Sequence, residues 1–272
     1  MDYVEIAIKT DNIPELLPEI LIAQLSEEGF ESFTEDNSYL CAYIKSSEFS
    51  ASKTDKVLSP YFVEYTSKII KQENWNAKWE SSYNYVEIDE ELVICAPFHK
   101  KVPQKKYRIT IAPKMSFGTG HHETTYLMCS LILKQDIVNK TVLDMGSGTG
   151  ILGILCSKKG AKSIAAIDID ELVLENINEN LELNKVTNIE AFTGNSSNIP
   201  NKKYDYILAN INKNVLVNDV PIYVKHLKKK SCLIISGFYS SDFEDIIYIC
   251  NKYGLKLAGH LEKNNWIAAL FI

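Results

Sequence analysis

The sequence predicts an α/β protein with a Rossmann-like domain, built on a mostly parallel sheet, behind a small ferredoxin-like α+β domain. Two observations support this fold class. Apolar strand segments alternate with helical segments between residues 141 and 236, which is typical of a parallel sheet with helices on both faces. The first 66 residues instead follow the order β-α-β-β-α-β, which is the ferredoxin-like pattern.

The N-terminal domain is expected over residues 1–66. Val4, Ile6 and Ile8 alternate with other residues, as in a strand with one buried face, and leucines at helical spacing follow. Two short strands come next, divided by the turn-forming pair Asp36–Asn37. The predicted elements are a strand at 3–9, a helix at 14–25, strands at 30–35 and 39–44, a helix at 49–58 and a strand at 61–66.

Residues 67–112 are expected to form a linker with lead-in strands, and residues 113–272 the larger domain. The lead-in strands are predicted at 85–88, 92–96 and 107–112. The larger domain should contain strands at 141–145, 164–168, 189–193, 204–209 and 232–236, and helices at 151–159 and 171–184. A helix at 242–252 and strands near 255–260 and 266–271 should add a C-terminal antiparallel hairpin to the sheet edge.

Composition narrows the class of protein. The formal charge is -6, and Arg108 is the single arginine, so a general nucleic-acid binder is not expected. The six cysteines form no CxxC pair, which favours free thiols over zinc sites or disulfides. The N-terminus carries no basic and apolar leader, and no apolar run reaches the length of a membrane span. We therefore expect a cytoplasmic protein that binds neither membrane nor, directly, nucleic acid.

A glycine loop follows the apolar strand at 141–145. Gly146, Gly148 and Gly150 stand at every second position before a predicted helix. Glycines allow a tight turn and close approach of a ligand, and the helix N-terminus offers free N–H groups. A purely structural turn is the alternative reading.

An acidic residue ends the next strand. Asp168 lies twenty-two residues after Gly146, where a carboxylate can accept both hydroxyls of a ribose. This arrangement indicates an adenosine-containing cofactor. The alternative is that Asp168 or Asp170 only caps the following helix.

The kind of cofactor depends on Asp144 and Ile151. Ile151 stands where a dinucleotide-binding loop usually has its third glycine, and Asp144 lies two residues before Gly146. A carboxylate beside the loop would repel a pyrophosphate but attract the cationic end of S-adenosyl-L-methionine. We therefore expect Asp144, Gly146, Gly148 and Asp168 to contact S-adenosyl-L-methionine.

Two further segments are candidates for the same site. Asn210 ends a predicted strand, and its amide oxygen can accept a hydrogen bond from an attacking amine, although a turn or helix-cap role is the alternative. The loop from Met115 to Thr125 contains two glycines and leads into a helix, so it is a candidate lid over the donor. His122 and Asn210 are the candidate catalytic residues. We expect no metal, because the adjacent histidines lack a third ligand at a recognisable spacing.

These motifs together resemble the PrmA family, the methyltransferases of ribosomal protein L11. The resemblance spans nearly the whole chain and rests on the 75–79 tryptophan segment, the 117–125 loop, the 144–150 loop, Asp168 and the 209–211 strand end. It implies a protein N-methyltransferase that uses S-adenosyl-L-methionine to modify lysine side chains and the N-terminal amine of that ribosomal protein. It also implies an N-terminal domain that binds the substrate.

By motif alignment the resemblance places cofactor contacts on Thr125, Gly146, Asp168 and Asn210. Many family members have cysteine where Ser147 stands, a small departure in a loop lined by backbone. Three alternatives stay open: a methyltransferase of another protein, a small molecule or RNA; a nicotinamide-dependent dehydrogenase; and a non-catalytic nucleotide-binding module. Fold alone does not separate them, and the sequence does not indicate the oligomeric state.

Overall fold

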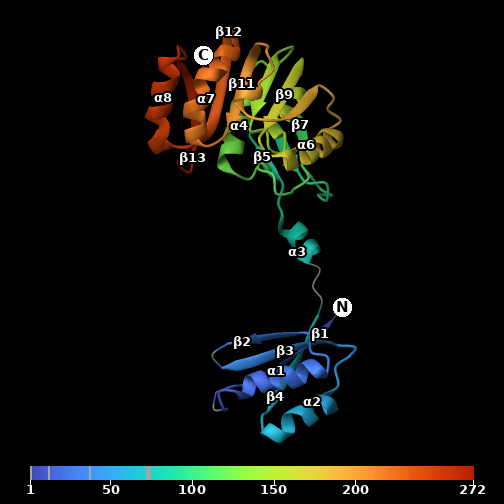
Figure 1. The fold of residues 1–272 in the computed structure, drawn as a ribbon. Coiled ribbons are helices and arrows are strands. Elements are labelled where there is room, and N and C mark those ends of the chain that lie inside the picture. Colours follow the sequence, from blue (N-terminus) through green and yellow to red (C-terminus); the bar gives the residue numbers. More distant parts are fainter. Residues whose placement is uncertain (1, 12, 37, 72–74) are drawn as a thin grey trace. The chain divides into compact units, whose positions relative to one another are not determined.

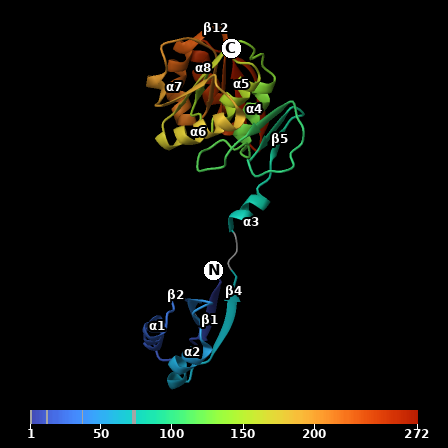
Figure 2. The same cartoon turned by 90° about the vertical axis from the view of Figure 1, so that its right-hand side faces the viewer.

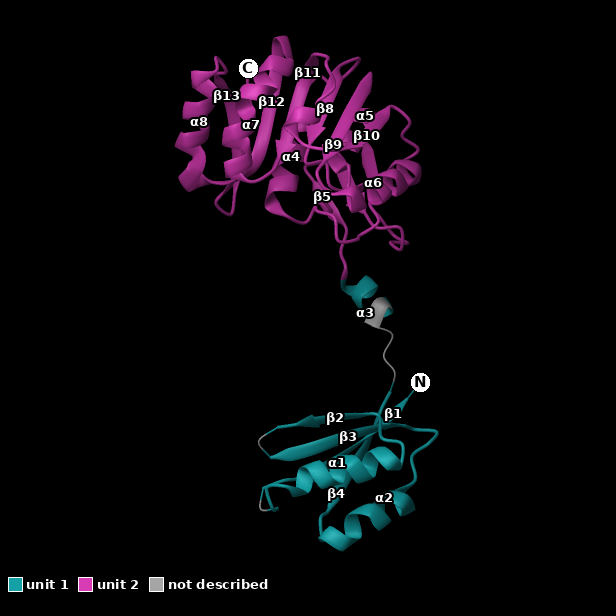
Figure 3. Ribbon diagram, in the orientation of Figure 1, with its two compact units in different colours: residues 1–82 teal, residues 83–272 magenta. Residues whose placement is uncertain are grey.

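The computed structural model describes residues 2–11, 13–36, 38–71 and 75–272. Asn37 of the predicted turn lies outside these residues, as do the side chains of Trp75 and Asn76. The chain forms two compact units, residues 1–82 and 83–272 (Figure 3). These boundaries correct the predicted ones, because position 66 falls inside a strand and residues 83–112 belong to the second unit.

Unit 1 is one four-stranded sheet with the order β2-β3-β1-β4, covered on one face by two helices (Figure 1). Its elements are β1 Tyr3–Lys9, α1 Leu17–Glu27, β2 Ser32–Glu35, β3 Tyr39–Lys45, α2 Ala51–Leu58 and β4 Tyr65–Ile70. All paired strands are antiparallel. Leu21 and Leu25, one helical turn apart, bury α1 against the strand residues Ile6 and Leu40.

The last strand of unit 1 starts later than the sequence suggested. Residues Ser59–Tyr61 form a short 3-10 helix with a proline near its start, and Phe62 then adopts a left-handed backbone with φ 56°. A chain turned in this way cannot pair until it has left the turn, so β4 begins at Tyr65 rather than at residue 61.

Unit 2 contains a sheet with helices packed against it (Figures 1 and 2). The sheet has seven strands in the order β10-β9-β8-β11-β12-β14-β13. The strands are β8 Thr141–Met145, β9 Ser163–Asp168, β10 Ile189–Thr193, β11 Tyr204–Asn210, β12 Leu227–Tyr239, β13 Leu257–Lys263 and β14 Trp266–Phe271. β10, β9, β8, β11 and β12 are parallel, whereas β14 pairs antiparallel with β12 and with β13. The Rossmann-like prediction with a C-terminal antiparallel hairpin is confirmed.

Helices cover both faces of this sheet. One hydrophobic cluster joins the sheet to α4 Glu123–Leu133, α5 Ile151–Lys158 and α6 Glu171–Asn184. The other joins it to α7 Lys213–His226 and α8 Phe243–Lys252. The helix α7 is absent from the sequence prediction, which has no helix between residues 210 and 231. Pro221 and several Asn and Val residues lower the helix propensity of this segment. Asn212 nevertheless caps α7, its side chain accepting from the Val215 N–H at 3.1 Å.

The lead-in strands belong to unit 2. β5 Val86–Ile88, β6 Leu92–Cys95 and β7 Tyr107–Thr110 form a small separate sheet that follows α3 Trp75–Ser82. Asn180 of α6 accepts the Ala112 N–H at 2.8 Å, and Asn184 accepts the Thr110 N–H at 2.9 Å. The side-chain amides of Asn180, which is buried, and Asn184, which is half-buried, therefore attach this lead-in segment to α6.

The six cysteines are free thiols, four of them buried. Burial raises the pKa of the Cys250 thiol to about 12, so it packs as a small apolar side chain. Within the residues described, no helix combines the length and apolar character that a bilayer crossing requires.

Candidate functional site

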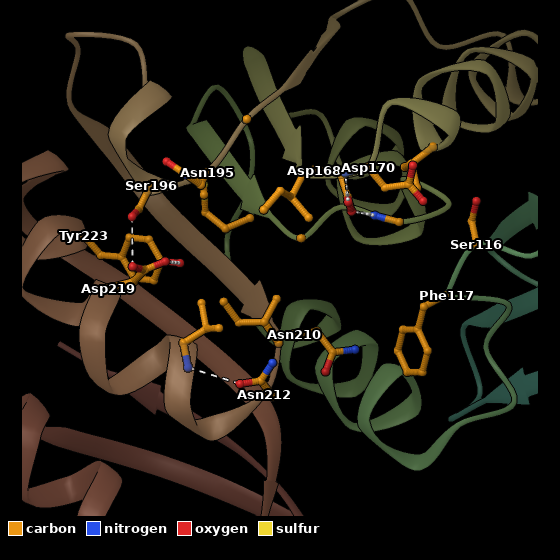
Figure 4. A pocket seen from close by; sticks show the side chains of 18 of the residues that line it. Ser116, Phe117, Asp168, Asp170, Asn195, Ser196, Asn210, Asn212, Asp219 and Tyr223 are labelled. Carbon is orange, nitrogen blue, oxygen red and sulfur yellow. Dashed lines mark hydrogen bonds between the residues drawn. The ribbon is translucent and has the colours of Figure 1, made fainter.

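A cavity of about 400 Å³ opens where the parallel strands of unit 2 end (Figure 4). Its wall is built from the ends of β8, β9 and β11, the turn after β10, residues 115–117, the first turn of α6 and one side of α7. Because all parallel strands carry their carboxyl ends at the same sheet edge, segments far apart in sequence meet there. The volume lies in the range of small-molecule sites.

The glycine loop is held by contacts that leave no room for side chains. Gly148 has φ 51°, and a Cβ there would lie 2.3 Å from the carbonyl oxygen of Phe117. A Cβ on Gly146 would lie 2.3 Å from Cγ2 of Ile211. The glycines are therefore required by the packing of neighbouring loops as well as by the cavity that Gly146 and Gly148 line.

The 115–125 loop is fastened to this glycine loop. The Thr149 N–H donates to the carbonyl oxygen of Phe117 at 2.9 Å, and the Thr149 hydroxyl donates to that of Gly118 at 2.5 Å. The Phe117 side chain, half exposed, forms part of the cavity wall. The two glycine motifs that the sequence singled out thus make one structure.

Asp168 lies at the centre of the cavity wall. Its Oδ2 accepts the Gly148 N–H at 2.8 Å and its Oδ1 accepts the Asp170 N–H at 3.2 Å. Each oxygen keeps a further lone pair for a ligand hydroxyl. The helix cap of α6 is Asp170, which accepts the Leu172 N–H, so the capping alternative holds for Asp170 and not for Asp168.

Asn210 ends β11 and lines the cavity beside Phe117 (Figure 4). Strand alternation puts it on the same face as Leu208, which packs in the cluster containing α4. Its Oδ1 is buried and has no hydrogen-bond partner among the described residues. A buried amide oxygen of this kind is costly unless a ligand uses it.

Asp144, expected to face the cofactor, instead points away from the cavity. Met145 lines the cavity, and strand alternation turns Asp144 to the opposite face, toward α4 and α5. It is fully buried, and its Oδ2 accepts the Gly153 N–H at 3.0 Å. Because the N-cap residue Gly150 has no side chain, Asp144 caps α5 in its place.

This setting changes the acidity of Asp144. Burial raises the pKa of the carboxyl to about 7, with the Gly153 N–H opposing the change and Asp168 adding to it. Its second oxygen has no partner among the described residues. Asp144 therefore holds the start of α5 behind the glycine loop and is not among the residues that line the cavity.

Thr125 and His122, at the start of α4, do not line the cavity either. The Thr125 hydroxyl is buried, and no partner for it is found among the residues described. His122 is the N-cap of α4, its Nδ1 accepting the Thr124 N–H at 3.2 Å. Its ring centre lies 5.2 Å from that of Phe117 and 4.9 Å from that of Trp266. His122 therefore supports Phe117 from behind.

One wall of the cavity was missed in the sequence. The turn after β10 contributes Gly194, Asn195 and Ser196, and α7 contributes Asp219 and Tyr223. The rule that pointed to Asp168 and Asn210, polar residues at strand ends, would also have found Asn195. Nothing comparable marked the α7 residues, because that helix itself was not predicted.

The chemistry of the wall indicates the kind of ligand. Among the described lining residues there is no lysine, arginine or histidine, whereas Asp168, Asp170 and Asp219 are acidic. Ile169, 76% exposed, and Val173 provide an apolar surface next to Asp168. A wall of this charge repels a pyrophosphate and suits a nucleoside that carries positive charge. The acidic wall favours S-adenosyl-L-methionine over a dinucleotide.

Comparisons with known proteins agree with this geometry. A family model described as ribosomal protein L11 methyltransferase (PrmA) matches residues 5–271, which includes parts of both units. The ribosomal protein L11 methyltransferase of Bacteroides fragilis is 40% identical over 279 residues and covers 100% of both chains. That of Porphyromonas gingivalis is 38% identical over 283 residues, covering 100% of this chain and 98% of its own.

A solved structure is similar as well. The crystal structure of ribosomal protein L11 methylase from Lactobacillus delbrueckii subsp. bulgaricus superposes with a TM-score of 0.66 and 27% identity. The match covers 70% of this chain and 98% of that one.

Proposed function

Because the chain belongs to the ribosomal protein L11 methyltransferase (PrmA) family, we propose that it methylates amino groups of ribosomal protein L11 with S-adenosyl-L-methionine as the methyl donor. The amino groups are lysine side chains, the N-terminal amine, or both. The observation that carries the proposal is the cavity at the strand ends, acidic and without basic residues among those described, which suits a cationic donor.

S-adenosyl-L-methionine supplies an activated methyl group on a cationic sulfur. The chain's task is then to bind, orient and exclude water. Gly146 and Gly148 let the backbone approach the donor, and Asp168 accepts the ribose hydroxyls. The free lone pairs of Asp168 and the exposed apolar side chain beside it, Ile169, support this placement.

Asn210 is the proposed catalytic residue. Its unpartnered Oδ1 accepts a hydrogen bond from the substrate amine and holds the nitrogen lone pair toward the methyl group. The amine must be neutral to attack, and solvent at the open cavity can take its proton. His122 is proposed as a positioning residue that fixes Phe117 next to Asn210. Thr125 is proposed as a donor contact on the resemblance to the family alone, because its buried hydroxyl does not line the cavity.

Unit 1 is proposed to hold the protein substrate. It has its own hydrophobic core, and none of its described residues lines the cavity. Tethering a second binding surface to the site raises the local concentration of each target amine. A ribosomal protein substrate also places the reaction in the cytoplasm, in agreement with the free thiols.

The decisive experiment is methyl transfer from radiolabelled S-adenosyl-L-methionine to purified ribosomal protein L11, with the modified residues located by mass spectrometry. An unrelated lysine-rich protein of similar size serves as the control substrate. Labelling of ribosomal protein L11 alone is expected, and Asp168→Ala should weaken donor binding by about 1.5 to 3 kcal/mol. Donor binding without labelling of ribosomal protein L11 would assign the enzyme another substrate.

A further inference from the structure

The cavity wall formed by α7 carries a carboxylate whose orientation is fixed. Asp219 lines the cavity, and its two oxygens accept hydrogen bonds from different elements (Figure 4). The Ser196 hydroxyl, in the turn after β10, donates to Oδ1 at 2.8 Å. The Tyr223 hydroxyl, one turn further along α7, donates to Oδ2 at 3.1 Å. Asp219 therefore joins two walls of the cavity.

Both donors are firmly placed. The Tyr223 side chain is fully buried, and burial together with the Asp219 charge raises the pKa of its phenol, so it stays protonated and donates. Ser196 is 8% exposed and follows Asn195, which caps its own short turn. With one lone pair of each oxygen used, Asp219 keeps acceptor capacity, and it lines the cavity.

Sheet topology fixes which part of the donor meets this wall. The strand order β10-β9-β8-β11 puts Asn195, Asp168, Gly146 and Asn210 in a row along the sheet edge. A donor whose ribose lies at Asp168 and whose methyl group lies at Asn210 must extend its base in the other direction. The base then lies at the end of β10, where Ser196 and Asp219 meet.

We propose that Asp219 selects the donor's base by accepting a hydrogen bond from the exocyclic 6-amino group of the purine. The proposal rests on the proposed function, since it takes the donor to be an adenosyl compound. A 6-oxo purine presents a carbonyl oxygen at the same position, and two acceptors facing each other repel. Asp219 is thus a specificity-determining residue toward adenine.

The test compares two ligands by calorimetry: S-adenosyl-L-homocysteine and its deaminated analogue, S-inosyl-L-homocysteine, which differ at the 6-position and in the N1 proton. The full chain should bind the adenosyl compound about 10- to 100-fold more tightly. In Asp219→Asn this ratio should move toward one, because an amide can donate to the 6-oxo group. The matched control is Asp55→Asn in unit 1, where Asp55 accepts a tyrosine hydroxyl in the same way, from Tyr65 at 3.0 Å.

Each outcome decides a separate point. Equal affinity of the unmodified chain for both ligands overturns the selection, and so does a ratio that Asp219→Asn leaves unchanged. Binding of neither ligand overturns the proposed donor instead. If thermal melting shows that Asp219→Asn does not fold, Ser196→Ala and Tyr223→Phe replace it. Each removes one donor that orients the carboxylate, and an unchanged ratio in both contradicts the proposal.

Discussion

The two units differ in the solvent exposure and the hydrogen-bond partners of their polar side chains. On the open sheet face of unit 1, polar groups pair with one another in contact with solvent: the Tyr3 hydroxyl donates to Glu31, and Lys45 pairs with the same carboxylate. In unit 2, Asp144 is buried and Asn210 is half-buried, and one buried oxygen of each has no partner among the described residues.

This difference separates surface from site. An exposed ion pair adds little to stability, because water solvates both charges almost as well when they are apart. A buried polar oxygen without a partner costs roughly 1 to 3 kcal/mol, so it persists only where something else requires it. For Asn210 we propose that the ligand supplies the missing partner. For Asp144 the other oxygen, Oδ2, caps α5, and this keeps the carboxyl group buried. Among the residues described, the buried side-chain oxygens without a partner all lie in unit 2.

The largest expected effect comes from separating the units. A chain of residues 83–272 should bind S-adenosyl-L-homocysteine as the full chain does, because every described residue that lines the cavity belongs to unit 2. Methylation of ribosomal protein L11 should fall by about 100-fold or more, the scale of a lost tethered binding surface. Circular dichroism checks that the shortened chain folds. A folded chain that methylates at the full rate would place substrate recognition in unit 2.

Residues at strand ends explain which parts of the site the sequence could predict. Asp168 and Asn210 follow apolar strands, so the edge of a parallel sheet brings them together whatever the loops do. Asp144 was misplaced because a one-residue step along a strand reverses the side chain's direction. Asp219 and Tyr223 were missed because Pro221 lowers the helix propensity of the segment that contains them, so no helix was predicted there. Burial of residues such as Leu216 and Val220 stabilises α7 despite this low propensity.

For the fold as well, features set by the local sequence were predicted better than features set by contacts between distant residues. Most apolar strands of unit 2 were predicted within a few residues, because burial on both faces leaves an unbroken apolar run. The exception is β12, which begins at Leu227, five residues before the predicted start at 232. The boundary between the units was not predicted correctly. It depends on hydrogen bonds between the 83–112 segment and Asn180 and Asn184, which lie far along the chain.

The next effect tests the unpartnered amide. Asn210→Ala should lower the single-turnover methylation rate by about 100-fold, because the amine is no longer held in line with the methyl group. Affinity for S-adenosyl-L-homocysteine, measured by calorimetry, should change much less. Asn212→Ala, which removes a neighbouring helix cap, is the control for disturbance of the strand end. An equal loss of affinity and rate would make Asn210 a donor-binding residue only.

A smaller effect tests the buried acid. With a pKa of about 7 in the fold and an ordinary value near 3.8 when unfolded, Asp144 binds a proton in the native state between these values. Native proton uptake means that stability falls as pH rises through this window and is level above it. Asp144→Asn keeps an acceptor for Gly153 but lacks the titration. Relative to the mutant, the unmodified chain should lose roughly 2 kcal/mol between about pH 5 and about pH 8.

Urea unfolding without ligand measures this difference, and subtraction of the two variants removes the titration of all other groups. The groups near Asp144 that can respond are Cys129 of α4, Cys156 of α5 and Asp168 of β9. Burial raises the pKa of both thiols, so neither titrates in the window. A constant difference between the variants across the window would show that Asp144 is ionised throughout.

The smallest effect is expected on the open face of unit 1, and its pH dependence has the opposite sign. Hydrogen bonds from Lys45 and then Tyr3 lower the pKa of Glu31, so the pair stabilises the fold above the unfolded pKa of Glu31. That contribution is lost as the pH falls through the lowered value, where the carboxylate takes up a proton. Lys45→Met should therefore destabilise slightly at neutral pH and not at all in acid. High salt should shrink the difference further, because solvent and ions screen exposed charges. Urea unfolding at low and high salt measures it. A loss as large as that of the buried acid, or one insensitive to salt, would mean that this face is covered in solution and that the contrast between the two units does not hold.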